Sequence, residues 1–388
     1  MPSRRHFLAS LAGAGALATA GCLGDDPPAT PADAQTDWPL PDFDATGSSY
    51  NQNSVAPRTS PTESWRQSVS HPTGRPVVAD GRVYLSTLGG LRTFARDGTP
   101  GWSLTPTEDR STARVTGPAV HDGTAYLGTD DERSLLALAT ADGSERWRAD
   151  VGPVSVAPAP DHDWGTVFVG TREGTVARVD TADGTVRWTT SVFGPVTSLA
   201  VSRDIAYVGT EAGEVYALFD GRGLWRRKLP GSVVDVATGN GGPVYATTFG
   251  GGTFELADGL HAGRTRWHAE NGPAKASLVV GAGTVYGADG GGVSAMRTTD
   301  GGRQWSLDGS FAAGMAGAGD TLYVGHEDGV DAYRTDGGLG LGSWRVDARR
   351  WRASVGGAAV RGLAVADGAV FVPVGGIESS DAALVTLA

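Results

Sequence analysis

The sequence predicts an all-β fold, an eight-bladed β-propeller of four-stranded antiparallel blades. Three observations carry this prediction: a strand segment that recurs eight times, an Asp-Gly turn that follows several copies, and a tryptophan that recurs with them. Gly is abundant at 59 of 388 residues, which suits many turns and short strands better than long helices. No unit shows a helical apolar period, so leucine-rich and helical repeats are disfavoured.

The recurring strand is apolar on both of its faces. In TVFVGT, Val167 and Val169 share one face while Phe168 points to the other. Such a strand must be covered on both sides, and a blade packed between two neighbouring blades supplies that cover. The eight copies are RVYLST at Arg82, TAYLGT at Thr124, TVFVGT at Thr166, IAYVGT at Ile205, PVYATT at Pro243, TVYGAD at Thr284, TLYVGH at Thr321 and AVFVPV at Ala369.

The turn and the tryptophan complete the unit. Asp-Gly between two strand patterns is a strong hairpin signal, because glycine takes a positive φ without steric cost. The tryptophans recur about every 41 residues, and four strands at this period are typical of propeller blades. We expect structural tryptophans near the outer strands at Trp65, Trp102, Trp147, Trp188, Trp225, Trp267, Trp305 and Trp351.

The two ends of the repeat array complement each other. Trp65 precedes the first complete unit, and the last unit stops at Ala388 without a tryptophan. An N-terminal strand that completes the last blade would close the ring and remove its exposed edges. A seven-bladed ring is the alternative, because the fifth unit is divergent and the seventh carries the insertion GLGLGSWRVDARR. There Trp344 competes with Trp351 for the outer strand, and the match of WRASVG to WRADVG favours Trp351.

The N-terminus predicts export and lipidation. Arg4 and Arg5 precede the weakly apolar run Phe7–Gly21, the pattern of a twin-arginine signal and too short for a stable membrane span. TAGC, ending in the single cysteine Cys22, resembles a lipobox whose cysteine is acylated; a chance cysteine is the alternative. We expect a signal peptide at 1–21, a lipidated cysteine and flexible Pro/Asp/Thr-rich tether at 22–61, and the propeller at 62–388.

Two aromatic residues in the expected tether, Trp38 and Phe43, either dock on the propeller or stay unstructured. The net charge of −11 does not indicate nucleic-acid binding, which is typical of basic surfaces. Of the 32 basic residues, two are lysines, Lys228 and Lys275. Excess carboxylate with scarce lysine suits a halophilic protein that stays soluble in high salt. A GC-rich genome, which also favours arginine, is the alternative.

The units VFVGTREGTVARVDTADGTVRW and AYLGTDDERSLLALATADGSERW resemble the pyrroloquinoline-quinone-like (PQQ-like) propeller repeat, and the resemblance runs from Thr62 to Ala388. It extends both to eight-bladed quinoprotein dehydrogenases and to the non-enzymatic propeller lipoprotein of the outer-membrane assembly machine. The signal, lipobox and acidic composition are similar to secreted twin-arginine lipoproteins of haloarchaea. Such cells have no outer membrane, so a role in outer-membrane assembly does not transfer directly.

The dehydrogenase resemblance implies a quinone beside a disulfide of adjacent cysteines, with a calcium ion and an aspartate base. Cys22 is the single cysteine, so that disulfide cannot form, and no calcium and base motif can be placed. We therefore expect no cofactor, PQQ included, and no catalytic residues; an enzyme stays the less favoured alternative. His121 and His162 fall in first-to-second-strand turns and can share a face, where solvated histidines are favoured over a metal site. No metal site is expected.

Loops on the rigid ring remain as the candidate binding surface. We expect a non-catalytic, lipid-anchored scaffold on the extracytoplasmic face of the cell membrane that binds a protein partner through its loop face. The alternatives are solvated surface carboxylates without a role, and a quinone-dependent oxidoreductase or a small-ligand or carbohydrate-binding propeller that uses the central funnel. The candidate residues are Asp130, Asp131, Glu132, Arg172, Glu173, Glu211, Glu327 and Asp328.

Overall fold

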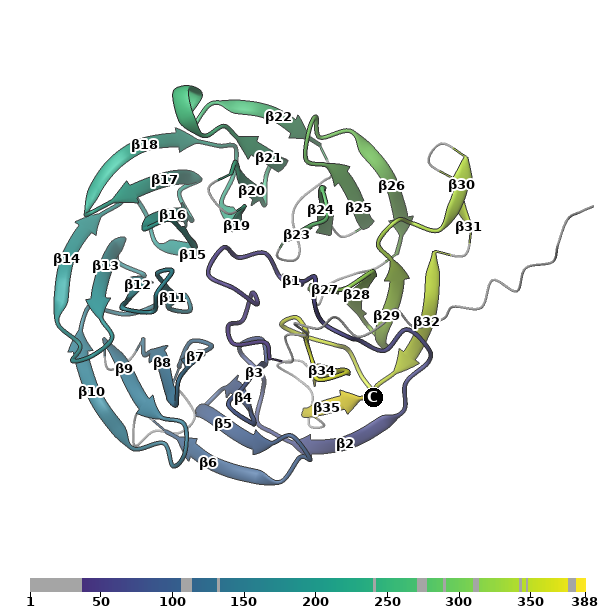
Figure 1. The fold of residues 1–388 in the computed structure, drawn as a ribbon, viewed down its shortest axis with the longest axis horizontal. Helices are drawn as coiled ribbons and strands as arrows, with labels where there is room; N and C mark the ends of the chain where they lie inside the picture. The colour runs from purple at the N-terminus through teal and green to yellow at the C-terminus, as the bar shows by residue number, and fades with distance from the viewer. Residues whose placement is uncertain are drawn as a thin grey trace, which may run out of the picture. The chain divides into compact units, whose positions relative to one another are not determined.

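Eight antiparallel sheets form the blades of a ring in the computed structural model (Figure 1). Each sheet has four strands, and one has a short fifth strand, so the predicted eight-bladed propeller is confirmed. Within the part of the chain that is described, no helix is long and apolar enough to cross a bilayer. The structure describes residues 37–105, 114–130, 133–239, 242–270, 278–288, 291–309, 314–341, 344–346, 348–375 and 382–388.

In each blade the first strand lies nearest the ring axis and the fourth lies outermost (Figure 1). Blades 1 to 3 contain β3 (Val77–Ala79), β4 (Arg82–Thr87), β5 (Gly90–Ala95) and β6 (Pro100–Leu104); β7 (Ala119–His121), β8 (Thr124–Gly128), β9 (Ser134–Ala139) and β10 (Glu145–Asp150); and β11 (Ala159–Pro160), β12 (Thr166–Gly170), β13 (Thr175–Asp180) and β14 (Val186–Ser191).

Blades 4 to 6 follow the same order. They contain β15 (Val196–Ser202), β16 (Ile205–Thr210), β17 (Glu214–Phe219) and β18 (Arg222–Lys228); β19 (Val233–Thr238), β20 (Val244–Thr248), β21 (Gly252–Leu256) and β22 (Thr265–Ala269), with the 3-10 helix η1 (Gly259–His261); and β23 (Val279–Gly281), β24 (Thr284–Ala288), β25 (Gly292–Arg297) and β26 (Arg303–Asp308).

The last two blades include strands from the N-terminal part of the chain. Blade 7 contains β27 (Met315–Ala318), β28 (Thr321–His326), β29 (Gly329–Arg334) and β32 (Arg349–Ser354), with β1 (Tyr50–Asn51) added parallel to β27. Blade 8 contains β33 (Ala364–Ala366), β34 (Ala369–Val374), β35 (Ala383–Leu387) and, as its outer strand, β2 (Glu63–Ser68).

Blade 8 closes the ring as predicted. β2 pairs with β35, so that Trp65 lies opposite Thr386, and Thr62 and Ala388 exchange two backbone hydrogen bonds of 3.0 Å. Trp351 lies on β32, the outer strand of blade 7. The competing Trp344 lies on β31 (Trp344–Val346), which forms a separate hairpin with β30 (Leu339–Leu341). The ring therefore has eight blades rather than seven.

The outer-strand tryptophans join each blade to the next. The indole N–H of Trp147 in blade 2 donates to the carbonyl oxygen of Thr181 in blade 3 at 2.9 Å. A Cβ atom at Gly184, in the same Asp-Gly turn, would lie 2.7 Å from the indole ring, so this position requires glycine. Trp351 has no such turn to meet, because the third and fourth strands of blade 8, β35 and β2, come from distant parts of the sequence, and it donates instead to Pro57 at 2.8 Å.

Residues 37–51, here called the central segment, cross the middle of the ring (purple in Figure 1). Trp38 is completely buried, and Leu40, Phe43 and Tyr50 are nearly so. The predicted boundary at residue 62 is therefore wrong for this part of the chain: residues 37–61 belong to the propeller and not to a flexible tether. Their Pro/Asp/Thr-rich composition is typical of a tether, but the four large apolar side chains supply enough burial to order them.

The central segment is held mainly by its backbone. Its carbonyl groups accept hydrogen bonds of 2.6–2.9 Å from N–H groups at the first strands of blades 1, 2, 4, 5, 6 and 7. Examples are Val120 to Pro39, Val201 to Ala45 and Val280 to Ser48. First strands otherwise turn an unpaired edge toward the axis, and the central segment satisfies that edge.

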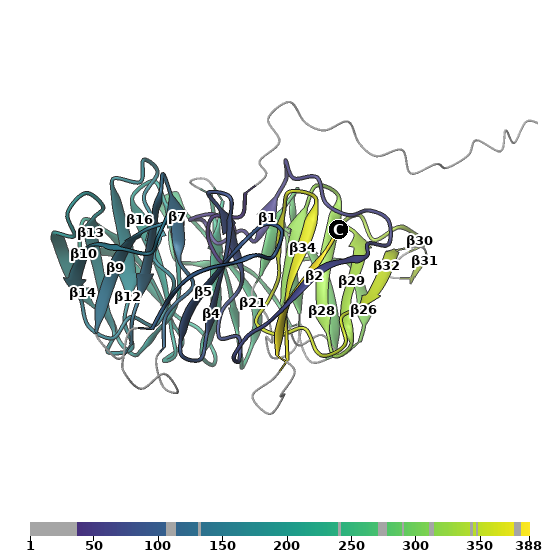
Figure 2. The ribbon, with the colours of Figure 1, turned by 90° about the horizontal axis from the view of Figure 1, so that it is seen from below.

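The strands run between two faces of the ring, seen edge-on in Figure 2. We call the side with the first-to-second and third-to-fourth strand turns the turn face. The side with the second-to-third strand loops and the connections between blades is the loop face. Asp37 pairs with Arg96, which lies in a turn of blade 1, so the described chain begins at the turn face.

Candidate functional site

Five loops of blades 3 to 5 form a continuous ridge on the loop face. They alternate between second-to-third strand loops and connections between blades. Each loop lies between two strands that are paired within the blades, so the blades fix both ends of every loop. The ridge comprises residues 172–174, 192–195, 211–213, 229–232 and 249–251.

Backbone hydrogen bonds link each loop of the ridge to the next. Val192 N–H donates to the carbonyl of Gly174 at 2.7 Å, and Glu211 N–H donates to that of Pro195 at 2.9 Å. The two remaining joints are the bonds from Leu229 to Gly213 (2.8 Å) and from Phe249 to Ser232 (2.9 Å). Because every neighbouring pair of loops is bonded, the ridge is one rigid surface rather than five independent loops.

Glycines allow this close packing of the loops. A Cβ atom at Gly213 would lie 2.9 Å from the carbonyl oxygen of Leu229, and one at Gly231 would lie 2.5 Å from the backbone nitrogen of Gly250. Any larger residue would push the loops apart. The recurring Gly in sequences such as GTREG and GTEAG therefore serves the contacts between blades as well as the turn itself.

The ridge exposes two large aromatic side chains. Phe193 is 65% exposed and Phe249 is 56% exposed, and Pro230 lies exposed in one of the two loops between theirs. The backbone N–H of Phe193 donates a hydrogen bond to the Tyr216 hydroxyl at 3.0 Å, which fixes the backbone at this position. A fixed backbone thus holds apolar rings in solvent, the arrangement expected of a docking surface.

The predicted loop-face residues of blades 2 and 3 lie together and are paired. Arg172 contacts Asp130 at 2.7 Å, and Arg133 contacts both carboxylate oxygens of Glu173 at 2.7 and 3.1 Å. The bonds from Arg133 hold the pKa of Glu173 below its usual value. These pairs are solvent-exposed, so they add little to stability, and they give the end of the ridge alternating rather than purely acidic charge.

The other predicted residues are distributed differently. Glu211 is exposed on the ridge itself, whereas Glu327 and Asp328 lie in the corresponding loop of blade 7, outside the ridge. Asp131 and Glu132 lie outside the described residues, as do Arg4, Arg5 and Cys22. Sequence reasoning missed Phe193 and Phe249; the available signal was a phenylalanine beside glycine in a loop between strands.

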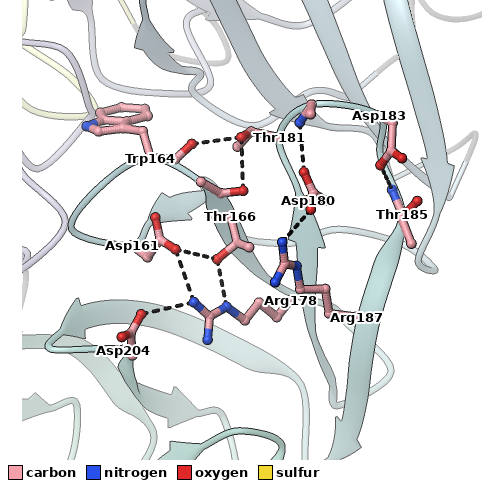
Figure 3. Close-up of polar contacts among 12 residues, drawn as sticks. Asp161, Trp164, Thr166, Arg178, Asp180, Thr181, Asp183, Thr185, Arg187 and Asp204 are labelled. Carbon is pink, nitrogen blue, oxygen red and sulfur yellow. Dashed lines mark hydrogen bonds and ion pairs between the residues drawn. The ribbon is translucent and has the colours of Figure 1, made fainter.

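Ion pairs on the turn face stiffen the blades that carry the ridge (Figure 3). Arg178 of β13 lies 3.0 Å from Asp161 in its own blade and 2.9 Å from Asp204 in the first turn of blade 4. Its guanidinium carbon also lies 5.0 Å from the ring centre of Phe168. Blades 3 and 4 are therefore bound to each other at both faces.

The two predicted turn histidines share the turn face, as their positions indicated. His121 stacks on Trp164 with 4.4 Å between ring centres, while His162 is exposed in the same turn as Trp164. Across the described ranges, no three His, Cys, Asp or Glu residues are grouped closely enough to hold a metal ion.

The middle of the ring contains a buried polar cluster from the chain itself. Arg75 Nη1 lies 2.9 Å from Oδ1 of Asp42 and 2.9 Å from the hydroxyl of Ser49. The carboxylate of Asp235 accepts N–H groups of Val236 and Leu278, both at 2.9 Å. Burial, and then the nearby charge of Asp42, raise the pKa of Asp235. The central segment and these side chains thus occupy the axis near the turn face.

Comparison with known proteins relates the chain to outer membrane protein assembly factors and, over a shorter stretch, to a protein kinase. The family model PQQ_2, described as outer membrane protein assembly factor BamB, matches residues 88–199 and 172–372. The chain is 30% identical over 281 residues to outer membrane protein assembly factor BamB of Xanthomonas campestris pv. campestris, covering 65% of this chain and 68% of that protein. It is 34% identical over 169 residues to the serine/threonine-protein kinase AfsK of Streptomyces griseus, covering 38% of this chain and a fifth (20%) of the kinase.

Solved structures share the fold at low sequence identity. A quinohemoprotein alcohol dehydrogenase from Comamonas testosteroni superposes with a TM-score of 0.72 at 15% identity, covering 92% of this chain and 81% of the enzyme. BamB from Moraxella catarrhalis gives a TM-score of 0.64 at 18% identity, covering 84% and 97%. At such identities the likeness concerns the fold alone.

Proposed function

Because the chain belongs to the PQQ_2 family, described as outer membrane protein assembly factor BamB, we propose that it is a non-catalytic scaffold that binds a protein partner through the ridge. In this proposal a lipid on Cys22 holds the propeller at the extracytoplasmic face of the cell membrane. The description of the family and the name of the relative from Xanthomonas campestris favour an assembly factor over an enzyme. The observation that carries the proposal is the exposure of Phe193 and Phe249 on a hydrogen-bonded, glycine-packed ridge.

The ridge has the composition of a protein interface. Aromatic residues, phenylalanine included, are enriched in protein interfaces, and a phenylalanine side chain contributes about 1.5–3 kcal/mol when fully buried. The pairs Arg172–Asp130 and Arg133–Glu173 border them as a polar rim. A rigid surface also loses little conformational entropy on binding, so more of the contact energy remains as affinity.

Capture of partners from native membranes tests the ridge. Wild-type protein, a Phe193→Asp/Phe249→Asp variant and a Phe219→Asp control are compared; Phe219 is also exposed, at 47%, but lies at the turn face. We expect a stoichiometric partner with wild type and control that is lost from the double variant, while all three melt alike. Equal capture by all three proteins would contradict the assignment of the ridge.

A quinone-dependent oxidoreductase that uses the central funnel is the second candidate, favoured by the superposition on the alcohol dehydrogenase. Two features oppose it: the central segment occupies the axis near the turn face, and Cys22 is the single cysteine. Titration with pyrroloquinoline quinone and calcium separates the two functions. Stoichiometric binding with dye-linked alcohol or sugar oxidation would overturn the scaffold proposal, and no binding is expected.

A further inference from the structure

The third-to-fourth strand turn of blade 5 is larger than those of blades 1 to 4 and 6, and it lacks the extra hairpin that blade 7 carries there. Blade 3 spans this connection with the short turn 181–185, whereas blade 5 uses residues 257–264, which include η1. At the tip of this expanded turn, Leu260 is as exposed as in an extended peptide, at 101%. It is the most exposed large apolar side chain of the described residues.

The expanded turn is rigid, so Leu260 is held in water rather than left there by a mobile loop. The N–H of Gly263 donates to Ala257 at 2.8 Å, and that of Ala257 donates to Arg264 at 2.7 Å. A Cβ atom at Gly263 would lie 2.9 Å from the Trp225 ring, so the base of the turn is seated on blade 4. Leu260 gains no burial when the chain folds, so its whole apolar surface remains available for burial against a partner.

Cationic side chains lie beside the exposed leucine. An open pocket of about 450 Å³ is lined by Ala257, Asp258, His261, Arg264, Thr265 and Arg266. Arg266 is occupied by the buried carboxylate of Glu255 at 2.8 Å. Arg264 is exposed, next to His261 and the leucine. An apolar tip flanked by a cation matches a phospholipid surface, which offers acyl chains below a layer of phosphate groups.

The expanded turn lies on the turn face, on which the described part of the chain also begins. Asp37, the first described residue, is bound by Arg96, and Arg96 also contacts Asp367 at 3.4 Å, both in turns of the turn face. The 14 residues 23–36 separate Asp37 from Cys22 and can span at most about 50 Å. With a lipid on Cys22, as the proposed function has it, the turn face is the side tethered to the membrane.

We propose that Leu260 and Arg264 form a second contact with the membrane, in which Leu260 enters the acyl boundary and Arg264 meets lipid phosphates. One acyl chain binds membranes only marginally, so a second contact is needed for stable attachment. Aspartates are spread over the turn face, at Asp80, Asp122 and Asp183 and also at Asp258 in the expanded turn itself, so the exposed leucine rather than the charge selects the edge that meets the bilayer. The ring meets the bilayer with the edge at blade 5, and the ridge points away from the membrane.

Vesicle flotation tests this contact without the lipid anchor. The protein is the chain from position 22 with Cys22→Ser, which includes all described residues, and the vesicles are phosphatidylglycerol–phosphatidylcholine mixtures. Leu260→Asp is compared with Leu224→Asp, a matched control on outer strand β18 with 53% exposure. We expect weak flotation of the parent and the control, and a roughly tenfold to hundredfold lower partition coefficient for Leu260→Asp.

Arg264→Gln provides a second readout, because it should weaken flotation on anionic vesicles more than flotation on pure phosphatidylcholine, which has a phosphate group but no net charge. Failure of the parent to float, or equal flotation of Leu260→Asp and Leu224→Asp, would overturn the contact. Thermal melts establish that each variant is folded. Leu260→Asp should still capture the ridge partner, so failure of this contact is distinguishable from failure of the scaffold proposal.

Discussion

The ring of Tyr50 occupies the space that a side chain at Gly317 would need. A Cβ atom at Gly317 would lie 2.1 Å from Cδ2 of Tyr50, and one at Gly281 would lie 2.4 Å from Cδ1 of the same ring. The first strands of blades 6 and 7 thus each have a glycine where the Tyr50 side chain of the central segment packs. Because the propeller leaves space for this side chain, the central segment is part of the fold.

Gly317→Ala should destabilise the protein by about 1–3 kcal/mol, because the added methyl group collides with the Tyr50 ring in a packed interior. Chemical denaturation measures the free energy of unfolding. Gly223→Ala is the control, since a Cβ atom at Gly223 meets nothing within 4 Å. Equal stability of the two variants would mean that the central segment does not pack as described.

Deletion of residues 62–69 should lower the free energy of unfolding by on the order of 3 kcal/mol. This value is at the low end of the stability loss expected when a packed tryptophan is removed, because Trp65 on β2 is partly exposed. The deletion also leaves β35 as an open edge, so aggregation on heating should increase. Deletion of residues 23–30, of equal length, is the control and should leave the melt unchanged. An unaltered melt in the 62–69 deletion would refute closure through blade 8.

His326→Thr should reduce the loss of stability at mildly acidic pH. His326 stands where blades 3 and 4 have a threonine at or directly after the end of the second strand, and there Thr210 and Thr171 accept backbone N–H groups of their own loops. Its Nδ1 likewise accepts the N–H of Asp328 at 3.2 Å. Burial, foremost, lowers the pKa of His326 below 6.5, although the facing carboxylate of Asp331 opposes this and Arg352 adds to it.

The sign of this pH dependence follows from proton uptake. Below pH 6.5 the unfolded chain binds a proton at His326 that the folded chain does not, so wild-type stability falls as pH decreases toward the folded pKa. One such proton accounts for at most about 1.4 kcal/mol per pH unit. Unfolding between pH 7 and 5.5 should therefore be less pH-dependent in His326→Thr. Parallel curves for the two proteins would contradict the assignment.

Cys22→Ser should move most of the protein from the membrane fraction to the soluble fraction after export, because the acyl anchor is lost. Arg4→Lys/Arg5→Lys should act earlier and leave an unexported precursor. Fractionation with immunodetection measures both. Unchanged membrane retention of Cys22→Ser would argue against acylation as the anchor.

The architecture could be predicted from the sequence because each blade depends on particular side chains at repeated positions. The apolar strand around Phe168, the Asp-Gly turn at Gly184 and the tryptophan at Trp147 each occupy a fixed position in a repeating unit, and the count of units closed the ring. The position of the central segment could not be predicted in this way. It accepts hydrogen bonds from backbone N–H groups such as that of Val280, and the side-chain sequence does not show which strand edges have unpaired N–H groups.

The site was predictable in location but not in chemistry. Acidic loops drew attention to the loop face, yet Asp130 and Glu173 are paired with Arg172 and Arg133, whose positions relative to them depend on the packing of neighbouring blades. Phe193 stands apart from any repeat position. Its exposure follows from the course of a single loop, which sequence spacing does not determine.

The pairing of the N-terminal residues with late parts of the chain sets the order of folding. Tyr50 needs Gly317, and Trp65 needs Thr386, so the first ordered residues to be synthesised wait for the last. Contacts so distant in sequence slow the search for the native state and leave unpaired strand edges open to proteases and to other chains meanwhile. Once both ends are in place, every blade is packed between two neighbours, so the ring has no terminal blade that could open without losing contacts on both of its sides.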